Sequence, residues 1–225
     1  MSVNEKMTAI AENIRSKTGG TEALTLDDMA SGVNEVFEAG KKAEYNEFWD
    51  IFQDYGNRTF YNTAFARGFP KASYNPKYNL KGSVNSTFAM GEITDVKVRI
   101  LDATDIQQIV RYNSSITRIP ELNISESTNF GTSSPFIGAT KLSDITLTGV
   151  LATSVSFSDC PLSVASMKSI ISCLKDYSAE APFTHTLTLK DSCKTALEGD
   201  TETVSFNGED YTYFELITAK GWNLA

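Results

Sequence analysis

Two short stretches of the sequence combine residue types that can carry out acyl transfer. Ser172 and Lys175 have the spacing of a Ser-x-x-Lys element, in which a lysine activates a serine nucleophile. Lys17-Thr18-Gly19 matches a second element that such enzymes use. The order of the two elements is reversed, however, and no Ser-Asp-Asn lies between them. The sequence therefore favours a plainer interpretation of Lys17-Thr18-Gly19 as the end of a helix, and we expect no enzymatic activity.

The remaining chemically versatile residues do not form a recognisable site. The one histidine, His185, lies in an alternating segment typical of a strand, so we expect a structural or surface role for it. The three cysteines, Cys160, Cys173 and Cys193, form no Cys-x-x-Cys pair, and we expect buried thiols. The sequence has no phosphate-binding loop, dinucleotide fingerprint or metal-ligand spacing. We therefore predict no cofactor and no metal ion.

The charge of the chain divides it into regions. The net charge is −8, yet residues 57–91 carry five basic residues and no acidic one. Residues 1–56 and the rest of the chain are both net acidic. With the patterns described below, this distribution predicts a helical attachment and oligomerisation segment over 1–56 and an aromatic, basic capping segment over 57–91. Repeating coils over 92–160 and a C-terminal cap over 161–225 follow.

The segment 1–56 shows helical periodicity. A helix is predicted to begin at Thr25, whose hydroxyl can cap it, and its apolar or small residues then recur at alternating steps of three and four. This heptad seam predicts a homo-oligomer held by a short coiled coil, a trimer if the chain belongs to a fibre. The alternative is that the seam packs on the chain's own first helix as a helical hairpin. The predicted oligomerisation residues are Leu26, Met29, Val33, Val36 and Ala43.

The segment 57–91 interleaves aromatic and basic residues. Such a composition can bind single-stranded nucleic acid or an anionic glycan, and the candidate ligand-binding residues are Tyr74, Lys77 and Tyr78. The alternative is a loop-rich cap whose rings pack on the end of the repeats. We favour the cap and expect no nucleic-acid partner, because the acidic chain would repel a polyanion at long range.

The region 92–160 repeats an apolar pattern on the scale of leucine-rich repeats. Its first members, Ile93, Ile116 and Leu142, are separated by 23 and then 26 residues. Phe88 and Phe136 precede two of the coils and are expected to fill the turn opposite the strand. The sequence thus predicts an α+β fold, in which an N-terminal helical hairpin or short coiled coil precedes a short, irregular leucine-rich-repeat-like solenoid with a C-terminal helix and strand cap.

The predicted C-terminal cap carries clear local signals. Ser163 is positioned to cap a helix whose apolar residues follow at helical spacing. A strand is predicted in "HTLTLKDS", and Asn207-Gly208 indicates a tight hairpin turn. A final short helix is expected to end near Gly221.

Several stretches resemble a known group of proteins. "PFIGATKLSDITLTGVLATSVSFSDCPLSVASMKSIISCLKDYS", "FWDIFQDYGNRTFYNTAFARGF" and the C-terminal end are similar to BspA-type leucine-rich-repeat proteins of gut Firmicutes and their phages. "IAENIRSKTGGTEALTLDDMASGVNEVF" resembles a leader of phage and prophage tail, baseplate and fibre proteins. The resemblance implies adhesion to surfaces, but it transfers no binding residue to this chain.

Together, these features predict a non-enzymatic structural protein of a phage or prophage virion, associated with the tail, baseplate or fibre. It would assemble in the host cytoplasm and display its repeats to a bacterial surface glycan or protein, or to other virion proteins. The alternative is a BspA-like adhesin on the bacterial surface or an intracellular protein-interaction module. The first residues lack a continuous apolar run, so we expect no secretion signal, and no stretch predicts membrane insertion.

Overall fold

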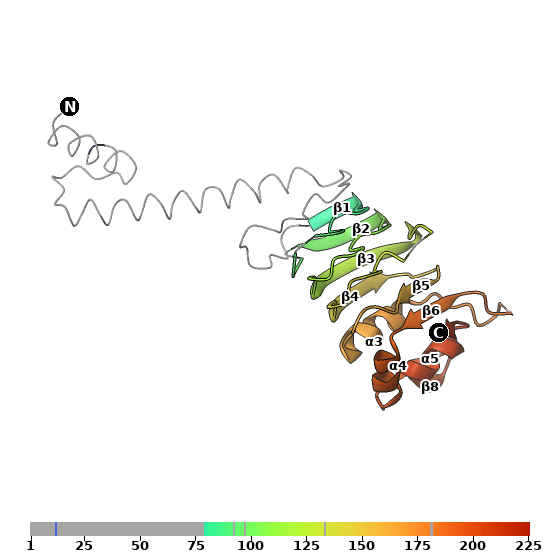
Figure 1. Cartoon of the computed structure of the whole chain (residues 1–225). Helices are drawn as coiled ribbons and strands as arrows, with labels where there is room; N and C mark the ends of the chain where they lie inside the picture. The colour runs from blue at the N-terminus through green and yellow to red at the C-terminus, as the bar shows by residue number, and fades with distance from the viewer. Residues whose placement is uncertain (1–11, 13–78, 92, 97, 133, 181) are drawn as a thin grey trace. The chain divides into compact units, whose positions relative to one another are not determined.

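A computed structural model describes residues 12, 79–91, 93–96, 98–132, 134–180 and 182–225 (Figure 1). Apart from Glu12, all of these belong to one unit, Phe52–Ala225. The predicted helical hairpin or coiled coil lies outside the described residues.

Four parallel strands form the first sheet, in the order β1-β2-β3-β4. They lie side by side in Figure 1, in the order of the sequence. Ile100 of β2 pairs with Leu80 and with Leu122, and Leu122 in turn pairs with Leu147, so the chain returns beside itself after 20 to 25 residues. The strands are β1 (Asn79–Ser83), β2 (Arg99–Asp105), β3 (Arg118–Asn129) and β4 (Asp144–Gly149).

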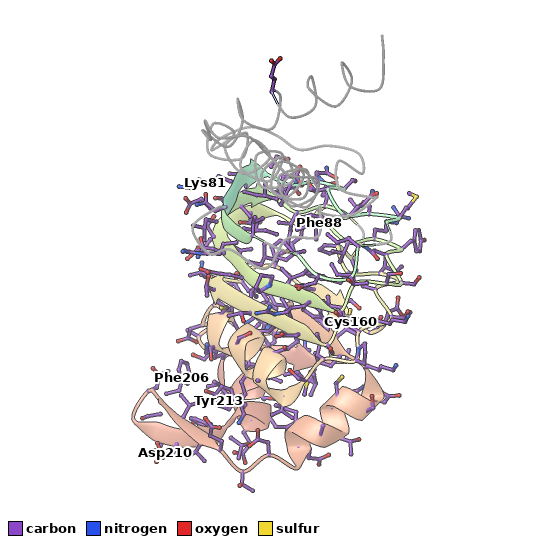
Figure 2. The ribbon with its side chains drawn as sticks, turned by 90° about the vertical axis from the view of Figure 1, so that its left-hand side faces the viewer. Lys81, Phe88, Cys160, Phe206, Asp210 and Tyr213 are labelled. Carbon is purple, nitrogen blue, oxygen red and sulfur yellow. The ribbon has the colours of Figure 1, made fainter. Side chains whose placement is uncertain are left out.

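The C-terminal part adds three helices, a second parallel sheet and one hairpin. The order of the second sheet is β5-β6-β9, and the hairpin β7–β8 is antiparallel. These elements are β5 (Val155–Phe157), α3 (Val164–Cys173), β6 (Thr186–Leu189), α4 (Asp191–Glu198), β7 (Thr203–Phe206), β8 (Glu209–Thr212), α5 (Tyr213–Ala219) and β9 (Asn223–Leu224). Figure 2 shows Lys81 of β1 at one end of the described part and Phe206, Asp210 and Tyr213 at the other.

The predicted α+β fold class is wrong. The described residues form a mixed α/β structure with two parallel sheets, and only β7–β8 is antiparallel. An α+β fold instead separates its helices from an antiparallel sheet. After each strand, the connecting segment returns the chain to the end of the sheet at which that strand began. The next strand therefore starts at the same end, and successive strands run in the same direction. Ile93, Val96 and Val98 are buried ahead of β2, which begins only at Arg99.

The core lies between the strands and the turns that connect them. Ile100 and Leu122 are fully buried on the inner face of the sheet, and Phe88 is fully buried in a turn. Phe136 lies in the corresponding turn and stacks on Phe157, with 4.4 Å between ring centroids. The prediction that Phe88 and Phe136 fill the turns is confirmed, and their rings supply much of the apolar area that a single coil cannot bury alone.

Helix α3 takes the place of a fifth strand at the edge of β4. The helix lies beside β4 in Figure 1. Ser166 and Ser169 lie three residues apart, so both face the strand. The Ser166 hydroxyl accepts a hydrogen bond from the Ile145 amide at 2.9 Å and donates one to the Ser143 carbonyl at 3.1 Å. The Ser169 hydroxyl contacts the carbonyl of Ile145 and the amide of Leu147, both at 3.2 Å. Side-chain hydroxyls thus satisfy a backbone edge that would otherwise be buried without partners.

The C-terminal cap follows its local signals. The Ser163 side chain accepts a hydrogen bond from the Ser166 amide and caps α3, and Asn207-Gly208 joins β7 to β8 with both residues at positive φ. Those two predictions and the short helix before Gly221 are confirmed. Lys220 follows α5, and its Nζ donates to three carbonyl oxygens at the end of α3, at 2.9 to 3.2 Å. Its charge complements the negative end of that helix.

Candidate ligand-binding surface

The outer face of the β1–β4 sheet is polar and is connected by ion pairs across neighbouring strands. Ile100 of β2, Leu122 of β3 and Leu147 of β4 are buried. Because side chains alternate along a strand, the residues next to them lie on the opposite face. One ion pair joins each pair of adjacent strands: Lys81 and Asp102 at 3.4 Å, Arg99 and Glu121 at 2.7 Å, and Arg118 and Asp144 at 3.0 Å. Such part-exposed pairs contribute little to stability, about 0–1 kcal/mol each. Their main effect is to fix where the charges lie.

Asp102 is the most unusual residue of this face. It adopts φ 49°, a left-handed conformation that few residues other than glycine adopt, aspartate and asparagine among them. The pairing register of β2 with β3 shifts between Ile100 and Ala103, so Asp102 sits at a bulge. As a result, its carboxylate projects from the sheet and is 72% exposed. Bulges of this kind often re-aim a side chain beside a functional site.

Asp102 belongs to a polar row that crosses all four strands, consisting of Lys81, Asp102, Asn123 and Thr148. The Asp102 amide donates to the Asn123 Oδ1 atom at 3.3 Å. The Asn123 Nδ2 group then donates to the Thr148 hydroxyl at 3.0 Å. The row presents an ammonium, a carboxylate, an amide and a hydroxyl on a continuous sheet, so it offers both hydrogen-bond donors and acceptors. This chemistry suits a ligand with several hydroxyl or amide groups and no strong net charge.

The nominal Ser-x-x-Lys element is not assembled as a nucleophile and its base. The Ser172 hydroxyl donates to the Lys168 carbonyl of its own helix at 2.8 Å. The Lys175 ammonium is bonded to Glu126 at 2.8 Å, and that bond raises the pKa of the lysine. A lysine that is held protonated cannot accept the proton of a serine. Ser172 is therefore engaged in a hydrogen bond within α3, and Lys175 in an ion pair with Glu126.

The three cysteine thiols are buried, and His185 packs against an aromatic ring. All three cysteines are free and buried, as predicted. Burial raises the pKa of Cys160 to about 12 and that of Cys173 to about 11, which keeps both thiols protonated and unreactive near neutral pH. His185 is half-buried and stacks on Tyr177, with 4.0 Å between centroids. Within the described part of the chain, no cluster of three His, Cys, Asp or Glu residues could hold a metal ion.

The predicted site residues and the observed surface do not overlap. The oligomerisation residues Leu26, Met29, Val33, Val36 and Ala43, like the ligand-binding candidates Tyr74, Lys77 and Tyr78, lie outside the described residues. The polar row was missed by sequence reasoning. Its only local signal is the interrupted alternation in "RILDATD", because a bulge shifts the side chains that follow it to the other face.

Comparisons of the chain with protein-family models, with curated proteins and with solved structures found no match.

Proposed function

We propose that the chain is a non-enzymatic structural protein of a phage or prophage particle, in which the β1–β4 sheet displays a recognition surface for a glycan of the bacterial envelope. The observation that carries the proposal is the polar row of Lys81, Asp102, Asn123 and Thr148. Its members stand on adjacent hydrogen-bonded strands, and two of its three links are hydrogen bonds. Groups placed on regular elements are held more precisely than groups on loops.

The chemistry of the row supports a glycan as the ligand. Sugar hydroxyls and N-acetyl groups both donate and accept hydrogen bonds, and so do the amide and hydroxyl of the row. A polyanion is disfavoured, because Lys81, Arg99 and Arg118, the cations that the structure describes on β1 to β3 of this face, are each paired with a carboxylate on the next strand. A large apolar ligand is disfavoured as well, because it would bury these polar groups without partners.

The placement in a virion rests on the leader-like N-terminal sequence, and the heptad seam predicts a homo-oligomer there. None of the described helices is long and apolar enough to cross a membrane. In this proposal, residues 1–56 contact the other virion proteins, and the outer face of the β1–β4 sheet remains available to bind the bacterial envelope.

Mass spectrometry of particles purified after induction of the strain that carries the gene tests the placement. We expect peptides of the chain to sediment with the particles, in a constant ratio to the major tail protein. Immunogold labelling should place the chain on the tail or baseplate. Absence from the particles together with labelling of intact cells would identify a bacterial surface adhesin instead.

A further inference from the structure

A shallow depression of about 190 Å³ lies between the loop after β3 and the strands β5 and β6. The hydroxyl-bearing residues Ser154, Ser156, Thr186 and Thr188 line one part of it. Phe130 and Pro135, both largely buried, line another part. None of the described side chains that line the depression is charged. The site is formed by elements other than β1–β4 and includes none of the residues of the polar row.

The strand alternation explains why hydroxyls gather there. In the parallel pair β5–β6, Val155 lies opposite Leu187 and both are buried. Ser156 lies opposite Thr188 in the next position, so both side chains point outward. The same two-residue period brings Ser154 and Thr186 to the outer face. Two pairs of hydroxyls therefore stand on adjacent strands, about 4.8 Å apart in the pairing direction.

The hydroxyls of this site are only partly used by the protein. Ser154 accepts a hydrogen bond from the Thr186 amide at 3.0 Å, and Ser156 donates to the Ser158 hydroxyl at 3.2 Å. Among the described residues, the hydroxyls of Thr186 and Thr188 form no hydrogen bond at all. Each threonine hydroxyl offers one donor and two acceptor positions. The depression thus combines fixed serines with two threonines whose hydrogen-bonding groups face outward.

We infer that this depression binds one neutral pyranose ring, the terminal sugar of a glycan. A sugar ring has hydroxyls that can pair with the four side chains and a C–H face that can lie against Phe130 and Pro135. A charged ligand would find no counter-charge, and a purely apolar one would cover the hydroxyls without satisfying them. The volume is below the roughly 300–1,000 Å³ typical of sites for drug-sized molecules, so it fits a single ring. The inference rests on the proposed function, for which it names a second and more specific site.

Titration of the full-length, ¹⁵N-labelled chain with single sugars tests the site. Galactose, glucose, mannose, N-acetylglucosamine and N-acetylgalactosamine serve as neutral probes, and galacturonate serves as the charged comparator. We expect at least one neutral sugar to shift the amide resonances of Ser156, Thr186 and Thr188 in a saturable way. Galacturonate should bind more weakly than its neutral counterpart, galactose. The inference is overturned if no neutral sugar binds or if galacturonate binds better than galactose.

Isosteric variants assign the binding to the hydroxyls. Thr188→Val keeps the shape and the strand preference of the side chain, and it should weaken sugar binding about tenfold, as loss of one hydrogen bond to the ligand implies. Ser156→Ala provides a second variant if Thr188→Val melts at a lower temperature than the parent. Thr203→Val, at an exposed position of β7 outside both the depression and the β1–β4 sheet, is the matched control and should leave binding unchanged. Unchanged sugar binding in both Thr188→Val and Ser156→Ala would overturn the inference.

The outcomes separate this site from the proposed function. If the chain is found in particles and binds cells, but Thr188→Val and Ser156→Ala bind sugars as the parent does, the sugar site is refuted and the proposed function stands. If the sugar binds and both variants weaken it, but the chain is absent from particles, the sugar site stands and the virion assignment falls.

Discussion

The edge of β4 offers the sharpest test of how the fold is held together, through the substitution Ser166→Ala. The Ser166 side chain is almost fully buried, at 2% exposure. Its hydroxyl is the partner of the Ile145 amide and of the Ser143 carbonyl. Removal of that single oxygen leaves the Ile145 amide without a partner at the end of the first sheet. The Ser143 carbonyl keeps the hydrogen bond that it accepts from the Ser163 amide at 2.8 Å, and α3 keeps its length and its cap at Ser163.

The expected loss of stability follows from the unpaired Ile145 amide. A buried donor or acceptor that loses its partner costs about 1–3 kcal/mol. Alanine is the better helix former by about 0.5 kcal/mol, which offsets part of the cost. We therefore expect the free energy of unfolding to fall by about 0.5–2.5 kcal/mol. For a domain of this size, that corresponds to a decrease in Tm of roughly 1–10 °C.

Urea denaturation of Ser166→Ala beside Ser172→Ala measures the effect. Ser172 is exposed in the same helix, and its hydroxyl bonds only the Lys168 carbonyl, so this control carries the change in helix preference without the loss at β4. Hydrogen exchange of the Ile145 amide should accelerate in Ser166→Ala alone. A difference between the two variants of less than about 1 kcal/mol, with the Ile145 amide still protected, would show that the serine hydroxyls do not hold the edge.

Two further predictions concern a glycine and a thiol. Gly149→Ala should destabilise the fold severely in thermal melts, because φ at this position is +94° and the added Cβ would lie 1.9 Å from the carbonyl oxygen of Ile124. Gly208→Ala is the control: its φ is +89°, but the space around it is open, so it should cost only about 1 kcal/mol. Because the pKa of Cys160 is raised from 9.0 to about 12, the folded state holds its proton where the unfolded state releases it, and stability should fall as pH rises from about 9 toward 12. Cys160→Ala should show a shallower fall over that range, and equal slopes for the two proteins would contradict the assignment.

Local features of the fold were predictable from the sequence. Ser163 caps α3 because its hydroxyl is followed by a run with helical spacing, and Asn207-Gly208 makes a hairpin because both residues tolerate positive φ. Phe88 and Phe136 were placed in turns from their positions ahead of two of the coils, and both are buried there. Each of these inferences depends on a few neighbouring residues, whose preferences tertiary packing reinforces.

The features that were missed depend on contacts between distant residues. The fold class was misjudged because the direction of pairing is decided by where the chain re-enters the sheet, more than 20 residues later. The bulge at Asp102 follows from the register between β2 and β3, which the alternation in one strand does not reveal. The threonines of β6 were read correctly as part of a strand, but only the pairing of Ser156 with Thr188 shows that hydroxyls gather on one face.

The measurement that tests the central claim most directly is binding of the fluorescently labelled full-length chain to a panel of bacterial strains, including the one that carries the gene. Asp102→Ala removes the projecting carboxylate of the polar row, and loss of a charged hydrogen bond of about 1.5–3 kcal/mol should raise the apparent Kd by roughly 10- to 100-fold. Glu198→Ala, at an exposed position of α4, is the control and should bind as the parent does. Enzymatic removal of envelope glycans should abolish the binding. Equal binding of Asp102→Ala and the parent protein, or binding that survives removal of the glycans, would contradict the account.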